Sequence, residues 1–345
     1  PSFLPSRIIK TMSVDILHFA RLPWPVSWAD FFGRQAPLLA EIGFGGGHFL
    51  VDWGQRRPDC NLLGLEISLP SLRRGAKKIA TSGVCNTRII QGDSTTALWL
   101  LCRTQCLAEV AINFPDPWPK ASHHHRRLIN EKFLHLLATR MKPGALLDIA
   151  TDHDDYTAVI TRCLLHSPYF ESRLDDPYTL SPGLRRATKY EQIAIAEGRI
   201  CRYFQWRRNN RHAADEFPIP EEKTVPHVVM SHPLNLNEIG AHFHPFQISP
   251  RSTHLKYLDM YRSLSSTVLL VEIYVSEEPH HQRVCLAVRS RQQGDIVVSL
   301  HELGFPRPTP GIHLAVHHLV QWLDSLHADA QIISSTLNPD TVGGG

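Results

Sequence analysis

The chain of 345 residues is long enough for two domains, and with 43% hydrophobic and 20% charged residues it has the composition of a globular protein. It contains neither an uninterrupted apolar segment of about 18 residues nor a signal-peptide pattern, which favours a cytoplasmic protein without a membrane span. Seven cysteines without a Cys-x-x-Cys spacing favour reduced thiols over a disulfide framework or a zinc site.

The net charge of +3 is unevenly distributed along the chain. Residues 213–345 carry 8 Lys and Arg against 14 Asp and Glu, a balance of −6. Residues 1–212 therefore carry 28 basic and 19 acidic residues, a balance of +9. Because neutralising phosphates and releasing their counterions is a main source of nucleic-acid affinity, the basic part is the one expected to bind a nucleic acid.

From residue 37 onward the pattern alternates between short buried strands and helices, after a proline-rich lead-in over residues 1–36. Strands are expected at 38–42, 61–67, 87–91, 109–113, 145–150 and 197–208, and helices at 48–56, 68–82 and 128–141. This alternation predicts an α/β domain over 37–212 with a Rossmann-like, doubly wound, mostly parallel sheet covered on both faces.

A glycine-rich loop, Gly43-Phe-Gly-Gly-Gly47, joins the first of these strands to the first helix. Such loops let a ligand approach the backbone and direct helix N–H groups at an anion. The run is neither G-x-G-x-x-G nor a P-loop. With Glu41 just before it, the loop better fits S-adenosylmethionine, whose carboxylate suits a helix end and whose amino group suits an acid.

Acidic side chains lie at or next to the carboxyl ends of four successive strands: Glu41, Glu66, Asp93 and Asp116. In open α/β sheets this edge binds the ligands. Glu66 is placed to accept hydrogen bonds from ribose hydroxyls, and Asp93 to meet an adenine amino group. Any one of these acids alone could be a helix N-cap, but four acids at successive strand ends are hard to explain in that way and favour a ligand at this edge.

The stretch 112–127, INFPDPWPKASHHHRR, combines a fixed carboxylate with an aromatic face and positive charge. Two prolines flank Asp116 and hold it extended at the end of a strand. Trp118 offers a flat apolar surface, and Lys120, Arg126 and Arg127 offer positive charge. This combination suits a polyanion with one base presented to a reagent. A Pro-rich loop with a capping Asp is the alternative.

Six segments in this order resemble bacterial tRNA (guanine-N7)-methyltransferases over residues 21–208. They are Glu41-Ile-Gly-Phe-Gly-x-Gly, Gly64-Leu-Glu-Ile67, Gly92-Asp93, Phe114-Pro-Asp-Pro-Trp-Pro-Lys120, Thr151-Asp152 and Thr188-Lys-Tyr-Glu191. The resemblance implies S-adenosylmethionine as methyl donor, and as acceptor the variable-loop guanosine of tRNA, usually at position 46.

The resemblance also implies site residues. Cofactor contacts are expected at Glu41, Gly43, Gly45, Glu66, Asp93 and Asp116, of which Asp116 also carries the catalytic role. Substrate contacts are expected at Lys120, Asp152, Thr188, Lys189, Tyr190 and Glu191. RNA contacts are expected at His123, Arg126 and Arg127. Ser122 and His125 stand where the family has Arg and Lys, which should weaken phosphate contact.

The chemistry makes modest demands, because guanine N7 already presents a free lone pair on the major-groove edge and no proton has to be removed first. Catalysis then reduces to positioning and to negative charge near a purine that becomes cationic. Our hypothesis is that Asp116 holds the guanine N1–H and N2 edge, with Asp152 and Glu191 sharing the recognition. Phosphates would be held by Lys120, Arg126, Arg127, Lys189 and the Arg185-Arg186 pair.

Three consecutive histidines, 123–125, invite interpretation as a metal site. Consecutive loop residues point in different directions, however, and no Cys or Glu completes a usual ligand pattern. The sequence therefore predicts no metal cofactor; these histidines are expected to stack on a base or pair with phosphate.

Beyond a proline-marked linker at 213–226, residues 227–345 predict a smaller C-terminal α+β domain. Strands are expected at 267–275, 284–289 and 296–300, with an amphipathic helix at 313–326. No motif in this domain carries chemistry. It could widen the tRNA footprint, form a homodimer or bind another protein, and its negative balance argues against the first.

Two other functions fit parts of the pattern. An amino-group methyltransferase acting on adenine also has an acid or Asn beside prolines after its fourth strand, but the Pro-Trp-Pro-Lys continuation and the 188–191 segment argue against it. An RNA-binding adaptor without activity belongs to a different class, and the four acids argue against that, because a retired site has no reason to keep them.

Overall fold

The computed structural model describes residues 15–183, 185, 187–221, 223–264, 266–291 and 294–342. The chain divides into two compact units, Pro1–Ile219 and Pro220–Gly345. Within the described residues, no helix is long and apolar enough to cross a membrane.

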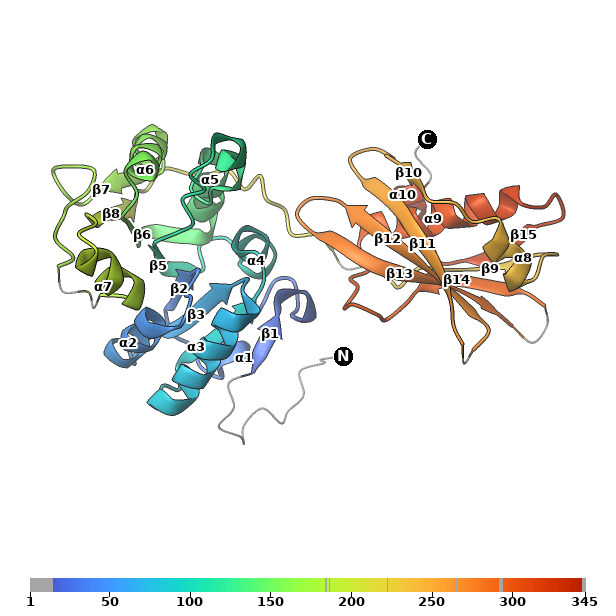
Figure 1. Ribbon diagram of the computed structural model, residues 1–345, viewed down its shortest axis with the longest axis horizontal. Helices are drawn as coiled ribbons and strands as arrows, with labels where there is room; N and C mark the ends of the chain where they lie inside the picture. Colours follow the sequence, from blue (N-terminus) through green and yellow to red (C-terminus); the bar gives the residue numbers. More distant parts are fainter. Residues whose placement is uncertain are drawn as a thin grey trace. The chain divides into compact units, whose positions relative to one another are not determined.

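The first unit is built on an eight-stranded sheet with strand order β1-β4-β3-β2-β5-β6-β8-β7 (Figure 1). Strands β1 to β6 run parallel to one another, whereas β8 pairs antiparallel with β6, and β7 pairs antiparallel with β8. Their bounds are β1 Ile16–His18, β2 Leu38–Ile42, β3 Asn61–Glu66, β4 Thr87–Gln91, β5 Leu107–Asn113, β6 Met141–Thr151, β7 Phe170–Ser172 and β8 Arg202–Arg208. The predicted mostly parallel α/β sheet is confirmed.

Helices cover both faces of this sheet. One face packs against α2 and α3 through Phe49, Trp53 and Leu72, and the other against α4, α5 and α6 through a larger apolar cluster that includes Phe133 and Ile160. The helices are α1 Trp28–Phe32, α2 His48–Arg56, α3 Leu69–Ser82, α4 Ser94–Leu101, α5 Glu131–Arg140, α6 Asp154–His166 and α7 Lys189–Ala196, with 3₁₀ helices η1 Phe19–Arg21 and η2 Ala121–Arg126.

Strands 38–42 and 87–91 and helix 48–56 match their predicted bounds. The predicted helix 128–141 is shorter, because Asn130 caps a helix that begins at Glu131 and β6 already starts at Met141. The strand predicted at 197–208 begins only at Arg202, since α7 ends at Ala196 and Gly198 turns the chain with a φ of 75°.

The segment that follows β8 closes the first unit. Arg140 in α5 is fully buried, and its Nη1 donates to both carboxylate oxygens of Asp215 at 3.0 Å. Its Nη2 donates to the Phe217 carbonyl at 2.7 Å, and the Phe217 ring lies in the core of this unit. The first unit therefore extends to Ile219, past the domain end predicted at residue 212, and residues 213–219 do not act as a linker.

The second unit is a seven-stranded antiparallel sheet of order β10-β11-β12-β13-β14-β9-β15, with α9 packed on one face through Ala315, Leu319 and Leu323. The three predicted strands correspond to β12 to β14, while the other four are additional. The bounds are β9 His227–Ser231, α8 Leu236–Ala241, β10 Phe246–Ile248, β11 His254–Arg262, β12 Val268–Ser276, β13 His281–Ser290, β14 Ile296–Leu300, α9 Pro310–Ser325, β15 Gln331–Ser335 and α10 Pro339–Val342.

Candidate active site

The glycine loop between β2 and α2 is shaped by left-handed backbone at Gly43, Gly45 and Gly47, with φ values of 69°, 55° and 72°. Side chains other than glycine rarely adopt this conformation. The Gly43 N–H donates to the Leu65 carbonyl at 2.8 Å, and the Gly45 N–H donates to Glu66 Oε2 at 2.9 Å. The loop is thus held against the end of β3, next to the N-terminus of α2.

Glu41, at the end of β2, is 1% exposed. Its Oε1 accepts a hydrogen bond from Asn113 Nδ2 at 3.0 Å, whereas its buried Oε2 has no protein partner. Burial raises the pKa of this carboxyl to about 8, partly offset by the Asn113 hydrogen bond and the Arg185 charge. A buried carboxyl oxygen without a protein partner suits a ligand donor, and a cationic amino group would both supply that donor and favour the ionised form of Glu41.

Glu66 and Asp93 both serve the backbone around them. Glu66 Oε1 accepts from the N–H groups of Ile67 and Ser68 at 2.9 and 2.8 Å, while its Oε2 accepts from the glycine loop. Asp93 is the N-cap of α4 and accepts from the Thr96 N–H at 2.9 Å. Because a carboxylate offers about four acceptor positions, both acids keep capacity for hydroxyl or amino donors.

The loop that carries Asp116 has an unusual backbone. Phe114 and Trp118 have φ values of 52° and 43°, a region that bulky residues seldom occupy and that is enriched at functional sites. Asp116 itself is exposed. The Arg126 guanidinium lies 5.0 Å from the Trp118 ring, and His123 meets the same ring edge-on at 5.8 Å. The aromatic surface predicted for a base is therefore already covered on part of its area by η2.

Arg127 does not fit its predicted role as an RNA contact. Its side chain is buried, its Nε donates to the Pro117 carbonyl at 2.7 Å, and its guanidinium lies 5.2 Å from the Tyr156 ring. It therefore anchors the Asp116 loop to α6. Arg126 and Lys120 stay exposed at the two ends of η2 and remain available to a polyanion.

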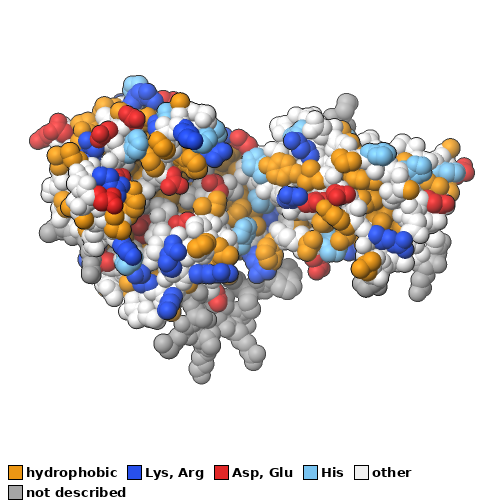
Figure 2. All heavy atoms as spheres, viewed as in Figure 1, with side chains coloured by type: hydrophobic (Ala, Val, Ile, Leu, Met, Phe, Trp, Pro, Cys, Tyr) orange, Lys and Arg blue, Asp and Glu red, His pale blue; other side chains and the backbone are white. Residues whose placement is uncertain are grey.

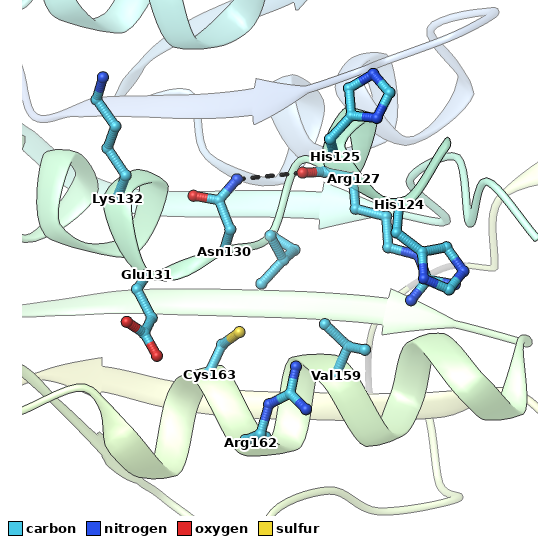
Figure 3. A pocket seen from close by; sticks show the side chains of 10 residues that line it. His124, His125, Arg127, Asn130, Glu131, Lys132, Val159, Arg162 and Cys163 are labelled. Carbon is cyan, nitrogen blue, oxygen red and sulfur yellow. Dashed lines mark hydrogen bonds between the residues drawn. The ribbon is translucent and has the colours of Figure 1, made fainter. Parts of the chain in front are cut away.

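Next to η2 lies a cavity of about 560 Å³, bounded by η2, the first turn of α5 and the middle of α6. Figure 3 shows His124 and His125 at one end and Arg162 of α6 rising beside Cys163, with Asn130 Nδ2 donating to the Arg127 carbonyl at 3.2 Å. The cavity lies beside the histidine run and carries both acidic and basic side chains.

Asp152 and Tyr190, two predicted substrate contacts far apart in sequence, are brought together by Arg199. The Arg199 Nη1 donates to Asp152 Oδ2 and, at 2.9 Å, to the Tyr190 hydroxyl. The guanidinium also lies 5.1 Å from the Tyr190 ring, whose centroid is 5.1 Å from that of Phe114. The sequence pattern does not single out Arg199, because a lone arginine after a Gly turn carries no motif.

Glu191 is fully buried, which does not fit direct recognition of a guanine. It completes a capping box with Thr188, and its Oε1 accepts from the Tyr203 hydroxyl at 2.6 Å. Its Oε2 accepts from Arg185 Nη2 at 3.0 Å. The T-x-x-E spacing is itself a capping-box signature, so the sequence did hold a signal for this role.

Arg185 was predicted to hold phosphates, but it occupies an interior position. It lies over the Phe49 and Tyr203 rings, and its Nη2 donates to Asn113 Oδ1 at 2.9 Å. Together with the contacts of Glu41 and Glu191, this makes a continuous polar chain from the glycine-loop acid to the start of α7. Arg186 lies outside the described residues.

The first unit has the class I S-adenosylmethionine-dependent methyltransferase fold. Three features define it: the glycine loop after β2, the acids at the ends of successive strands, and an antiparallel β8 beside a parallel sheet. Residues 35–202 match the family described as "Putative methyltransferase". A crystal structure of the 16S rRNA methyltransferase KamB, 11% identical, aligns with a TM-score of 0.40 over 56% of this chain and 99% of that one.

A tRNA (guanine-N(7)-)-methyltransferase of Thermus thermophilus is 30% identical over 307 residues, which cover 88% of this chain and 94% of the relative. A tRNA (guanine-N(7)-)-methyltransferase of Paraburkholderia xenovorans is 39% identical over 176 residues, which cover 51% of this chain and 67% of the relative. The chain belongs to the tRNA (guanine-N7)-methyltransferase family and is a methyltransferase. Because 307 residues exceed the length of the first unit, the Thermus match includes residues of the second.

Proposed function

We propose that the enzyme transfers the methyl group of S-adenosylmethionine to N7 of guanosine 46 in the variable loop of tRNA, giving N7-methylguanosine and S-adenosylhomocysteine. The donor is supported by the buried Oε2 of Glu41, which has no protein partner and lies beside the glycine loop, on the strand-end edge that also carries Asp116. The acceptor is supported by membership of the tRNA (guanine-N7)-methyltransferase family. With tRNA as the substrate, we infer a cytoplasmic location.

The residues at this edge match the groups of the donor. Glu41 Oε2 would accept the amino group, and the N–H groups at the start of α2 would receive the carboxylate. Glu66 would accept from the ribose hydroxyls and Asp93 from the adenine amino group. When bound, S-adenosylmethionine supplies an electrophilic methyl group on a sulfonium centre.

On the acceptor side, the enzyme needs to orient a base and stabilise positive charge. Asp116, exposed on its proline-flanked loop, would accept hydrogen bonds from the guanine N1–H and N2 groups and place its negative charge near the purine ring. The Asp152–Arg199–Tyr190 cluster, which touches Phe114 at the start of that loop, would form the adjoining wall. No side chain has to remove a proton from N7 before it reacts.

We expect the full chain to methylate an unmodified tRNA transcript carrying G46, and a transcript with A46 to yield no product. Methyl incorporation from labelled S-adenosylmethionine, followed by nucleoside analysis, would detect N7-methylguanosine. Methylation of the A46 transcript at another guanosine would contradict the position, and N6-methyladenosine as product would favour the adenine alternative. Cofactor binding without product from any tRNA would favour the adaptor.

The raised pKa of Glu41 predicts a pH-dependent affinity for S-adenosylmethionine. With a pKa of about 8, Glu41 is mostly protonated at pH 7, and a bound cationic amino group would favour its ionised form. Near pH 7 binding should therefore release a proton, and affinity should rise about tenfold per pH unit between pH 6 and 7.5, pass through a maximum near pH 8 and fall above it, where the amino group of the cofactor loses its own charge. Isothermal titration calorimetry in buffers of different ionisation heats would count the released protons.

Glu41→Gln provides the comparison, because its amide oxygen can still accept from Asn113 while the side chain no longer ionises. We expect this variant to bind more weakly and with a flatter pH profile. The amino group of the cofactor titrates equally in both experiments. An unchanged pH slope in Glu41→Gln would assign the titration to the ligand and contradict the role of Glu41.

A further inference from the structure

We propose that a cationic groove between α3 and α7 binds the phosphate backbone of the tRNA on the opposite face of the sheet from η2. This α3–α7 groove has a volume of about 670 Å³, and its lining includes His48, Arg74, Lys77, Lys78, Lys189 and Tyr190. The inference rests on the proposed function, since it takes tRNA as the substrate, and it adds a binding surface that the motif residues alone do not define.

The charge of the groove is one-sided. Four Lys and Arg side chains line it together with His48, and none of the described residues that line it is acidic. Lys78 Nζ lies 2.8 Å from His48 Nε2, and burial together with the charge of Lys189 lowers the Lys78 pKa. Cations gathered without carboxylates repel one another, and a polyanion that replaces their small counterions relieves that repulsion.

The groove adjoins the reaction site. Lys189 and Tyr190 lie in the first turn of α7, directly after the Thr188 cap, and Gly46 of the glycine loop also lines the groove. Tyr190 is 48% exposed, and its ring centroid lies 5.1 Å from that of Phe114, where the Asp116 loop begins. A strand of RNA lying in the groove would therefore reach the base site directly, with an aromatic side chain at the junction.

The occupant that fits is an extended backbone, because the cations follow an open surface. Arg74 and Lys77 are exposed on α3 and Lys189 is exposed on α7. Figure 2 shows Lys and Arg side chains gathered over the part of the first unit where Figure 1 draws α2 and α3. RNA recognition by such surfaces combines phosphate neutralisation with stacking, and both features are present here.

The groove and η2 lie on opposite faces of the same sheet. Helices α2 and α3 pack on one face, whereas α5 and α6, which border η2, pack on the other. Phosphate contacts from both faces would hold the RNA on either side of the strand-end edge that carries Asp116. The groove would also supply phosphate contacts in place of those lost where Ser122 and His125 replace the Arg and Lys of the family.

The test compares two double variants of the full chain. Arg74→Ala/Lys77→Ala removes two exposed groove cations from a helix in which alanine is favourable. Arg103→Ala/Lys142→Ala removes two exposed cations near the amino ends of β5 and β6, on the opposite edge of the sheet. For each, tRNA binding would be measured from 50 to 300 mM salt, along with the affinity for S-adenosylmethionine.

We expect the groove variant to bind tRNA about tenfold or more weakly at physiological salt, with the slope of log K against log salt smaller by about 2. Its cofactor affinity and the tRNA affinity of the control variant should match the wild type. If the wild type binds tRNA and the groove variant binds it equally well with the same salt slope, the groove proposal is overturned and the proposed function stands. If the wild type binds no tRNA, the proposed function falls and the groove proposal with it.

Discussion

Asp116→Asn is expected to lower the turnover number for methyl transfer to tRNA by about 100-fold, while the dissociation constant for S-adenosylmethionine stays within a few-fold. The amide keeps the shape of the carboxylate but removes its charge and replaces one acceptor oxygen with an NH2 donor, so that one of the two proposed hydrogen bonds from guanine is also lost. Because methylation at N7 makes the purine cationic, the loss falls on the transition state, and removing one preorganised electrostatic partner of this kind typically costs about 100- to 1,000-fold. Single-turnover kinetics with saturating tRNA would isolate the chemical step.

A matched control is Asp155→Asn, which changes an exposed acid in the first turn of α6, on the same strand-end edge. Its turnover should equal that of the wild type. Full turnover by Asp116→Asn would remove Asp116 from the catalytic role. A loss confined to the KM for tRNA would show that Asp116 binds the base equally in the ground and transition states.

The strands of the first unit could be read from the sequence because a parallel sheet buried on both faces needs continuous apolar runs, such as 38–42 and 61–66. Helix α4 could not be predicted in this way. Its residues 97–101 are all buried, so the helix lacks the periodic polar face that marks a surface helix. In the second unit, β15 is exposed along its whole length and shows no alternation.

In the candidate site, the sequence predicts the positions of the acids but not the partners of the charged side chains. The positions of Glu41, Glu66, Asp93 and Asp116 follow from topology, because the carboxyl ends of parallel strands meet at one edge. The partners of charged side chains depend on contacts between residues far apart in the sequence. Glu191 is buried against Arg185 and Tyr203. Arg127 is buried against Pro117 and Tyr156. A glutamate or an arginine in these motifs could equally well be exposed and contact RNA, so the sequence does not distinguish the two positions.

The contacts of Arg140 in α5 with the segment after β8, here called the clasp, predict a large difference in the free energy of unfolding between two truncated chains. Ending the chain at residue 212 removes Asp215 and Phe217, which leaves the fully buried Arg140 guanidinium without its ion pair and opens the core at Phe217. Removing one partner of a buried pair costs about 3–5 kcal/mol, and removing a buried phenylalanine costs a similar amount. Asp215 is partly exposed, so solvent reduces the first contribution.

We therefore expect the chain ending at residue 212 to be at least about 4 kcal/mol less stable than the chain ending at residue 219, measured by urea unfolding. In the full chain, Glu216→Ala should have little effect, because that side chain is 71% exposed. Equal stability of the two truncated chains would show that the clasp contributes nothing. Only the chain ending at residue 219 can test whether the second unit assists methylation, because inactivity of the shorter chain would reflect a broken core and not a missing tRNA contact.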